Sequence, residues 1–235
     1  MSVWICIPSI RPGGGTIPEW KRAGYRVAIV RQGPPVPEAD IEIPTDRYLG
    51  WSASINMAVR AAMEADPQAQ WFVGGGDDTL PDASNHPEFI ARQCYEYFKG
   101  NFGVMQPIGD LKLWPNSAID KFAGSPWMGR AFCKRIYGGK GPMWEEFGHM
   151  FADEHCKCVA EKLGVYWMRS DLIHKHMHAL RSAGGKIPDF LKPVNTKEHW
   201  EHSKAIFQRL EAGGFAEADN LLTEANREEE ILKAC

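Results

Sequence analysis

Short apolar runs alternate with segments of helical periodicity along the first third of the chain. The runs "VWICIPSI" at residues 3–10 and "YRVAIV" at residues 25–30 have the length and composition of buried strands, and a Thr-Ile-Pro helix start lies between them. Apolar side chains recur at helical spacing over residues 52–65, and a third strand pattern, "AQWFVGG", follows. Strands that alternate with helices form a mostly parallel sheet, so the sequence predicts an α/β fold with helices flanking the sheet.

The remainder of the chain continues this pattern less regularly. We expect a helix at residues 87–100, a strand at 102–109, a helix at 151–164 and a short strand, "VYWM", at 165–168. Residues 110–148 are rich in glycine and aromatic side chains, which we interpret as functional loops. Two C-terminal helices are predicted, one begun by a capping box of Asn195 and Glu198 and one over residues 215–233. We therefore expect a domain at residues 1–190 and a helical hairpin at residues 191–235 packed on it.

Bulk properties set few limits on function. The 235 residues carry a net charge of -3 with a pI near 6.2, which neither implies nor excludes nucleic acid as a partner. No apolar run approaches the roughly 20 residues of a membrane span. Pro8 interrupts the first run before it can form the core of a signal peptide. We expect a cytoplasmic protein without a membrane span, in which the six cysteines, including the pair in "HCKC", are free thiols.

Two adjacent carboxylates, Asp77 and Asp78, follow the third predicted strand and a run of three glycines. A turn needs only one Gly or Asp, so the second carboxylate calls for a further explanation. Carboxylate oxygens suit Mg²⁺ or Mn²⁺, and such ions keep water and substrate phosphate as their other ligands. The alternative is that both residues only shape the turn. The loops "PSIRPGGG", "RQG" and "GGGDD" each follow a predicted strand, so all three are expected at one edge of the sheet, where α/β proteins bind ligands.

Four segments in fixed order carry a resemblance to a known family. They are "IPSIRP", "GWSASINMAVRAA", "WFVGGGDDTLPD" and "YGGKGPMWEEFGHMFADEHCKCVAEKLG". In this order they resemble GT-A glycosyltransferases of the family-2 type, from Val3 to about residue 178. The short chain is also similar to bacteriophage-type transferases, some of which modify hydroxymethylated bases in DNA. The resemblance implies a GT-A, Rossmann-like sheet, a nucleotide-sugar donor (a UDP-sugar is favoured) and Mn²⁺ or Mg²⁺ as cofactor.

The resemblance also implies roles for individual residues on the donor side. The residues expected to line the nucleotide base and ribose are Pro8, Ser9 and Arg11, with Arg31 or Gln32 nearby and Asn56 beside the nucleotide. Asp77 would touch the ribose or a water on the metal, and Asp78 would bind the metal on the diphosphate. Many relatives have a third acidic residue where this chain has Gly76, which weakens the ribose contact. A further metal ligand is expected among the histidines that follow, in the order His176, then His174, with His178 as the third candidate, against the alternative that they are surface histidines at a helix start.

On the acceptor side, Asp153 and Glu154 match the acidic pair of the family. We expect Asp153 to be the catalytic base, with Glu154 second, against the alternative that both only stabilise a helix N-terminus. Trp127 and the glycines of "YGGKGPMW" are expected to form a sugar-binding lid. The basic residues around this lid, expected either to contact diphosphate or an anionic acceptor or to lie in a solvated loop, are Arg130, Lys134, Arg135 and Lys140.

Two other classes of function use the same residues. In a metal-dependent hydrolase of a phosphoester or glycoside, the aspartates and His174 or His176 would bind the metal. A non-catalytic nucleotide-sugar binder would hold the ligand and turn nothing over. A modified DNA base remains one acceptor to test, supported by the basic loop from Arg130 to Lys140 and opposed by the acidic pI.

Overall fold

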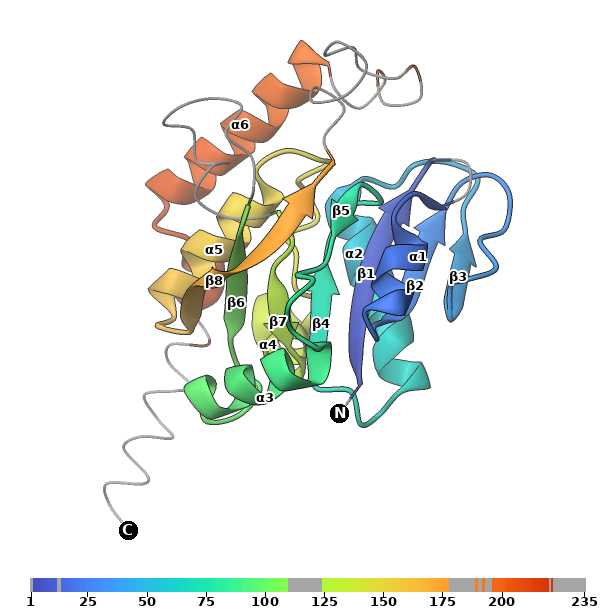
Figure 1. Cartoon of the computed structure of the whole chain (residues 1–235). Coiled ribbons are helices and arrows are strands. Elements are labelled where there is room, and N and C mark those ends of the chain that lie inside the picture. The colour runs from blue at the N-terminus through green and yellow to red at the C-terminus, as the bar shows by residue number, and fades with distance from the viewer. Residues whose placement is uncertain are drawn as a thin grey trace.

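An eight-stranded sheet forms the centre of the protein (Figure 1). The computed structural model describes residues 2–11, 14–109, 124–177, 189, 192, 196–219 and 221. Its strands are β1 (Val3–Ser9), β2 (Arg26–Arg31), β3 (Ile41–Pro44), β4 (Trp71–Gly74), β5 (Thr79–Leu80), β6 (Val104–Gly109), β7 (Trp127–Gly129) and β8 (Tyr166–His176). Their order in the sheet is β3-β2-β1-β4-β7-β6-β8-β5.

Strand directions confirm the predicted fold class. Strands β1 to β4 pair in parallel, and β6 is parallel to β8. Two strands run the other way: β7 lies antiparallel between β4 and β6, and β5 is antiparallel to β8. The carboxyl ends of β1, β2 and β4 therefore lie at one edge of the sheet, which we call the rim.

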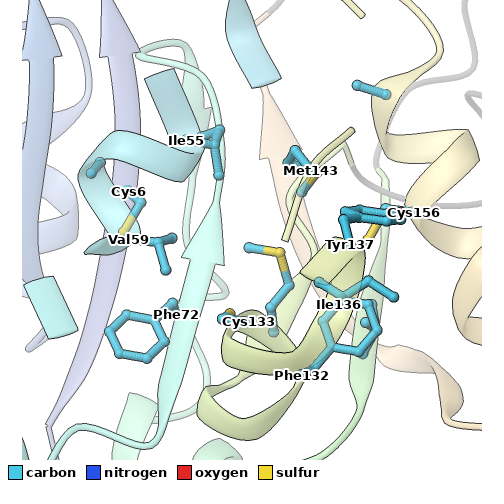
Figure 2. Close-up of a cluster of buried hydrophobic side chains, with 14 of the residues drawn as sticks. Cys6, Ile55, Val59, Phe72, Phe132, Cys133, Ile136, Tyr137, Met143 and Cys156 are labelled. Carbon is cyan, nitrogen blue, oxygen red and sulfur yellow. The ribbon is translucent and has the colours of Figure 1, made fainter. Parts of the chain in front are cut away.

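Helices cover both faces of the sheet, and alternate side chains of β1 point into the two cores that these helices form with it. Alternate side chains, beginning with Val3, belong to a core shared with α1 (Ile17–Arg22) and α3 (Pro87–Phe98). The intervening side chains, Trp4 and Cys6, belong to a second core. The helices of that second core are α2 (Trp51–Ala65), α4 (Arg130–Arg135) and α5 (Ala152–Lys162). Figure 2 shows how α2, β4 and α4 meet in this core around Phe72 and Cys133.

The C-terminal residues that the structure describes, 196–219 and 221, pack beside α5. Helix α6 (Lys197–Ala212) is followed by a 3-10 turn, η7 (Ala216–Ala218), and Phe207 of α6 packs on Phe151 with ring centroids 5.6 Å apart. The predicted cap at Asn195 is wrong by one residue, because the Thr196 side chain accepts the hydrogen bond from His199 N at 3.1 Å. The predicted second helix falls mostly outside the described residues, and the division at residue 190 stays a prediction.

The stretch at residues 110–148 is more regular than expected. Residues 110–123 lie outside the described part, but the chain then forms β7, α4 and a 3-10 segment, η3 (Ile136–Gly139). The strand predicted at residues 165–168 extends to 11 residues in β8, and β3 was missed because "IEIP" is short and only half-buried. Among the described residues, no helix is long and apolar enough to span a bilayer.

Candidate active site

Three of the predicted donor-binding residues meet at the rim. The Ser9 hydroxyl at the end of β1 donates a hydrogen bond to the Asp77 carboxylate at 2.5 Å, and Arg11 Nε lies 3.5 Å from the same carboxylate. Ser9 and Asp77 are 68 residues apart in the chain, yet β1 and β4 are neighbours, so the strand order brings them together. The expected shared edge is present, with a carboxylate between a hydroxyl and a guanidinium.

The turn that carries Asp77 is tied to the start of α1. Thr16 N donates to the Asp77 carbonyl oxygen at 2.9 Å, and the Trp20 indole donates to Thr79 O at 2.7 Å. Gly15 has φ +61°, and a Cβ built there would lie 1.9 Å from the Asp77 carbonyl oxygen. Only glycine permits this approach of two backbone segments. The glycine-rich loop after β1 thus fixes the acidic turn in position.

The three glycines before Asp77 determine how closely the acidic turn packs against its surroundings. A Cβ on Gly76 would lie 2.7 Å from Asp78 Oδ1, so the space beside Gly76 is filled by the carboxylate of this chain. The Trp51 indole, at the start of α2, donates to Gly75 O at 3.1 Å. The absence of a side chain at Gly76 therefore leaves room for the Asp78 carboxylate, and the hydrogen bond from Trp51 ties the backbone of the glycine run to α2.

Strand β8 delivers His176 to the acidic turn. Thr79 pairs with His176 across β5 and β8, and Met177 N donates to Asp78 O at 2.6 Å. His176 Nε2 lies 3.3 Å from Asp78 Oδ1, with 29% of its side chain exposed. The structure therefore brings together the carboxylate and the histidine that sequence analysis ranked first as metal ligands.

His174 occupies a different environment, which corrects its assignment as a metal ligand. It is 1% exposed, its Nδ1 pairs with the Ser125 hydroxyl at 2.6 Å, and the Trp20 ring lies against it at 5.3 Å. Burial lowers the pKa of His174 to about 3, so the ring is neutral at ordinary pH. His174 is a core histidine beneath the rim, and His178 lies outside the described residues.

Asp153 and Glu154 lie in the first turn of α5, at the same edge of the sheet. A Cβ on Gly124 would lie 3.1 Å from Asp153 Oδ2, and Pro126 O accepts from Gly74 N at the end of β4. The segment 124–126 thus connects Asp153 to the rim. Phe151, in the left-handed region at φ 66°, ends the preceding loop and begins the helix.

The charges of this second acidic pair are coupled to each other and to His176. Burial raises the pKa of Asp153, although its own and Glu154's backbone N–H groups, and a charged His176, act to lower it. Burial and the nearby Asp153 charge raise the pKa of Glu154 to about 7. His176 therefore lies close enough to influence both Asp78 and Asp153 electrostatically, which links the two acidic pairs.

In the first pair, burial also acts on Asp77. Burial raises the pKa of Asp77, while the Ser9 hydrogen bond and the Arg11 charge act against burial, and the adjacent Asp78 raises it further. This carboxylate thus has partners that stabilise its charged form.

Two residues at the rim, Tyr48 and His149, were not predicted from the sequence. The Tyr48 hydroxyl and His149 Nδ1 lie 3.1 Å apart, and the pKa of Tyr48 is raised by burial and by the charge of Asp77, which places Tyr48 near the acidic turn. Gly148 O accepts from Trp51 N at 2.5 Å, so the loop before α5 is fastened to the start of α2. Tyr48 follows the missed strand β3, which is why its position at the rim could not be inferred.

Other predicted site residues have structural roles or lie elsewhere. Trp127 is fully buried in β7, so its assignment to a sugar-binding lid is wrong. Asn56 is also buried, and its side-chain amide donates to Met143 O at 2.8 Å and accepts from Met143 N at 2.9 Å. These contacts correct the prediction that Asn56 lies beside the nucleotide. Pro8 is buried within β1, and Arg31 pairs with Glu42 at the end of β2.

Arg130 and Arg135, two of the basic residues predicted around the lid, lie away from the acidic turn. Arg130 donates to the carbonyl oxygens of Met63, Asp66 and Ala69, at the end of α2 and the start of β4. That position is the edge of the sheet opposite the rim. Arg135 lies over the Phe102 ring at 4.7 Å, before β6 begins, and Lys140 O accepts from Arg60 in the middle of α2. A role for Arg130 in binding diphosphate at the rim is therefore wrong.

The residues at the rim fit a divalent cation in their donor types. Asp78 offers a carboxylate and His176 an imidazole nitrogen, both of which Mn²⁺ accepts. Among the residues that the structure describes, no three His, Cys, Asp or Glu side chains converge as a complete protein cage. A cation at this position would take its remaining ligands from water and diphosphate, as is common for ions bound through one or two side chains.

A cavity of about 480 Å³ lies between α6 and the segment that precedes α5. Its lining residues are Glu146, His202, Ala205, Ile206 and Arg209. An ion pair between Arg209 and Glu146 joins its two walls. Because the Glu146 segment leads into the helix that carries Asp153, this cavity is on the α5 side of the molecule rather than the β2 side.

No protein-family model and no curated protein matches this chain. Similar solved structures include a glycosyltransferase involved in glycosylation of the major capsid of PBCV-1 (12% identity, TM-score 0.46, 75% of this chain and 94% of that chain). Another is the catalytic domain of Drosophila beta1,4galactosyltransferase 7 (14%, 0.48, 84% and 81%), and a third is a putative glucose-1-phosphate thymidylyltransferase from Bacillus anthracis (9%, 0.43, 87% and 94%). The structural neighbours thus include glycosyltransferases and nucleotidyltransferases.

Proposed function

We propose that this protein is a metal-dependent glycosyltransferase that moves a sugar from a nucleotide-diphosphate donor to an acceptor hydroxyl. One observation carries the proposal: Asp78 and His176 meet at 3.3 Å on the rim, beside Asp77 and within electrostatic reach of Asp153. This arrangement provides a cation site and a separate carboxylate base at the same edge of the sheet. The order of motifs along the chain supports the same reaction class.

The donor is assigned to the β1 and β4 side of the rim. Ser9, Arg11 and Asp77 form a hydrogen-bonded and charged group there, in which Arg11 can neutralise part of a diphosphate and Asp77 can accept from a ribose hydroxyl. Arg31, at the end of β2, is the next residue along the same edge. We favour a UDP-sugar as donor because of the family resemblance.

Asp78 and His176 would hold Mn²⁺ or Mg²⁺. When bound, the cation supplies charge stabilisation for the departing nucleoside diphosphate. The protein's own contribution is the fixed position of both ligands, which follows from the β5 and β8 pairing and from the Met177 N to Asp78 O hydrogen bond.

Asp153 is proposed as the base that accepts the proton of the attacking hydroxyl. It is half-buried, and its carboxylate lies against Gly124 at the rim. A base must be ionised to act, and the backbone N–H groups of Asp153 and Glu154 favour the ionised form of the Asp153 carboxyl. Burial raises the pKa of Asp153 as well, and the pKa of Glu154 is raised to about 7, so the two neighbouring carboxyl groups bind and release protons as a pair.

The acceptor is assigned to the α5 and α6 side. The cavity beside Glu146 and Arg209 is lined by opposite charges and by the buried Ile206, a mixture that suits a sugar or another polyhydroxyl compound. A hydroxymethylated base in DNA stays in the acceptor screen. The basic residues that favoured DNA, however, include Arg130 and Arg135 at the opposite edge of the sheet, so they lend this acceptor no support.

Calorimetry with a panel of UDP-, GDP- and other activated sugars tests the proposal. The native chain is titrated with Mn²⁺ and with chelator, beside Asp78→Ala and the exposed control Glu64→Gln at the far end of α2. We expect one donor to bind only with metal, in the native chain and in Glu64→Gln, and binding to be lost in Asp78→Ala. No donor binding by the folded native chain would overturn the proposal. Donor consumption at the same rate with and without acceptor would instead identify a hydrolase.

A further inference from the structure

Helix α5 carries the proposed base in its first turn, and a buried histidine follows directly. His155 is fully buried, and its ring is surrounded by the rings of Tyr137, Trp144, Phe147 and Phe215 at centroid distances between 5.2 and 6.4 Å. A polar ring in such an apolar environment is costly to bury unless its nitrogens are hydrogen-bonded. The partners of both nitrogens therefore determine whether the start of α5 is stable in this position.

Both nitrogens have partners from elements distant in sequence. Nε2 lies 2.5 Å from the Glu217 carboxylate of η7, and Nδ1 lies 3.3 Å from the Tyr137 hydroxyl. A carboxylate can only accept, so Nε2 carries a proton in this contact. Burial acts to raise the pKa of Glu217, but the hydrogen bond and charge of His155, together with Lys162, hold it below its usual range.

Lys162, two turns of α5 further on, contacts the same C-terminal segment. Its ammonium donates to Gly214 O at 2.7 Å, to Phe215 O at 3.0 Å and to the Asp219 carboxylate. Positions seven apart lie on one face of a helix. Residues 214–219, which we call the C-terminal clasp, thus contact α5 at its first and its last turn along a single face.

We propose that Glu217, acting through His155, is a positioning residue for Asp153 and Glu154. Contact at two points fixes both the axial position and the rotation of α5, and the rotation decides where the side chains of its first turn point. The clasp therefore holds Asp153 against Gly124 and near His176. The functional part of this inference rests on the proposed glycosyl transfer, whereas the fixing of α5 does not.

Glu217→Ala, Glu217→Gln and Lys162→Met test the clasp in the full chain, with Glu211→Gln on the exposed face of α6 as the matched control. Hydrogen exchange is followed at the amides of the first turn of α5, where His155 N donates to Phe151 O at 2.9 Å. In Glu217→Ala we expect these amides to exchange about tenfold faster or more, with β1 and β4 unchanged. Glu217→Gln keeps an acceptor oxygen and should retain most of the protection.

Turnover supplies the second readout. Displacement of the base should lower kcat by about tenfold or more in Glu217→Ala and leave the donor KM within about twofold. If the first-turn amides of Glu217→Ala exchange as slowly as those of Glu211→Gln, or if exchange rises uniformly along the chain, the proposal that the clasp fixes α5 would be overturned. Faster first-turn exchange with unchanged kcat would overturn the positioning role. If the native chain transfers no sugar, the proposed function fails, while the exchange comparison still decides whether the clasp fixes α5.

Discussion

The rim contains two acidic pairs whose surroundings differ. Asp77 and Asp78 end a strand and are contacted by a hydroxyl, a guanidinium and an imidazole, from Ser9, Arg11 and His176. Asp153 and Glu154 begin a helix, and in Glu154 the pKa is raised by burial and by the neighbouring carboxylate. A pair contacted by a guanidinium and an imidazole suits the binding of a charged ligand, whereas a pair in which burial and the neighbouring carboxylate raise one pKa to about 7 suits proton exchange.

The largest expected effect separates the two pairs by function. Asp153→Asn keeps the shape of the side chain and removes the base, so we expect kcat to fall by about 10²–10⁴-fold. Donor affinity measured by calorimetry should stay within about twofold, because the donor contacts the other pair. The same measurements on Asp78→Asn should show the opposite pattern, in which the main effect is the loss of donor binding. Loss of donor binding in Asp153→Asn would mean that the two pairs form a single ligand site.

The two histidines of β8 provide the next test. Removal of one ligand of the cation in His176→Ala should weaken Mn²⁺-dependent donor binding by about 10–100-fold. His174→Leu, which replaces a buried ring of the core, should lower the melting temperature and leave donor affinity unchanged. The comparison is made by calorimetry at a temperature where both variants are folded. Equal loss of donor affinity in the two variants would contradict the distinction between them.

The pH dependence of stability tests the second pair. The pKa of Glu154 is about 7 in the folded protein and near 4.5 in the unfolded chain, so the folded state binds more protons between these values. The stability that this protonated carboxyl contributes is complete below about pH 4.5 and is lost as the pH rises through about 7. Glu154→Gln removes this dependence, so its free energy of unfolding relative to the native chain should rise by about 1–3 kcal/mol between pH 4.5 and pH 8.

Urea denaturation at both pH values measures this difference, with Glu211→Gln as the exposed control. A native chain and a Glu154→Gln variant with parallel pH dependence would show that Glu154 ionises normally. The proposed division of roles between the two pairs would then lose its electrostatic basis.

Much of the fold followed from periodicity, because β1, α2, β4, α3 and α5 are long or strongly apolar segments that bury one face or both. The short strands β3 and β7 carry too few residues for a period to show. The acidic turn and its neighbours at the rim were placed correctly because parallel strands end at a common edge.

The roles of Asn56, Trp127 and His174 could not be inferred from local pattern, because each depends on depth below the surface. His174 and His176 occupy alternate positions of one strand, but His174 lies beneath the turn against Trp20, and His176 lies beside Asp78. The spacing of residues in a sequence specifies on which face of a strand each side chain lies. It does not specify which positions along that face are covered by other elements. An amide that suits a ligand also suits the interior when backbone partners are available, as Met143 is for Asn56.

The smallest expected effect concerns the support of the first pair. Ser9→Ala removes the hydrogen bond to Asp77 and the one that the Ser9 hydroxyl accepts from Arg11 N, and it keeps the ion pair between Arg11 and Asp77, so we expect donor affinity to weaken by about 3–10-fold. At saturating donor, kcat should be unchanged, because the hydroxyl of Ser9 does not belong to the second pair. The exposed Ser84→Ala is the matched control. A fall in kcat without a change in affinity would move Ser9 and Asp77 from donor binding to the reacting centre, and would require the two acidic pairs to act as one unit.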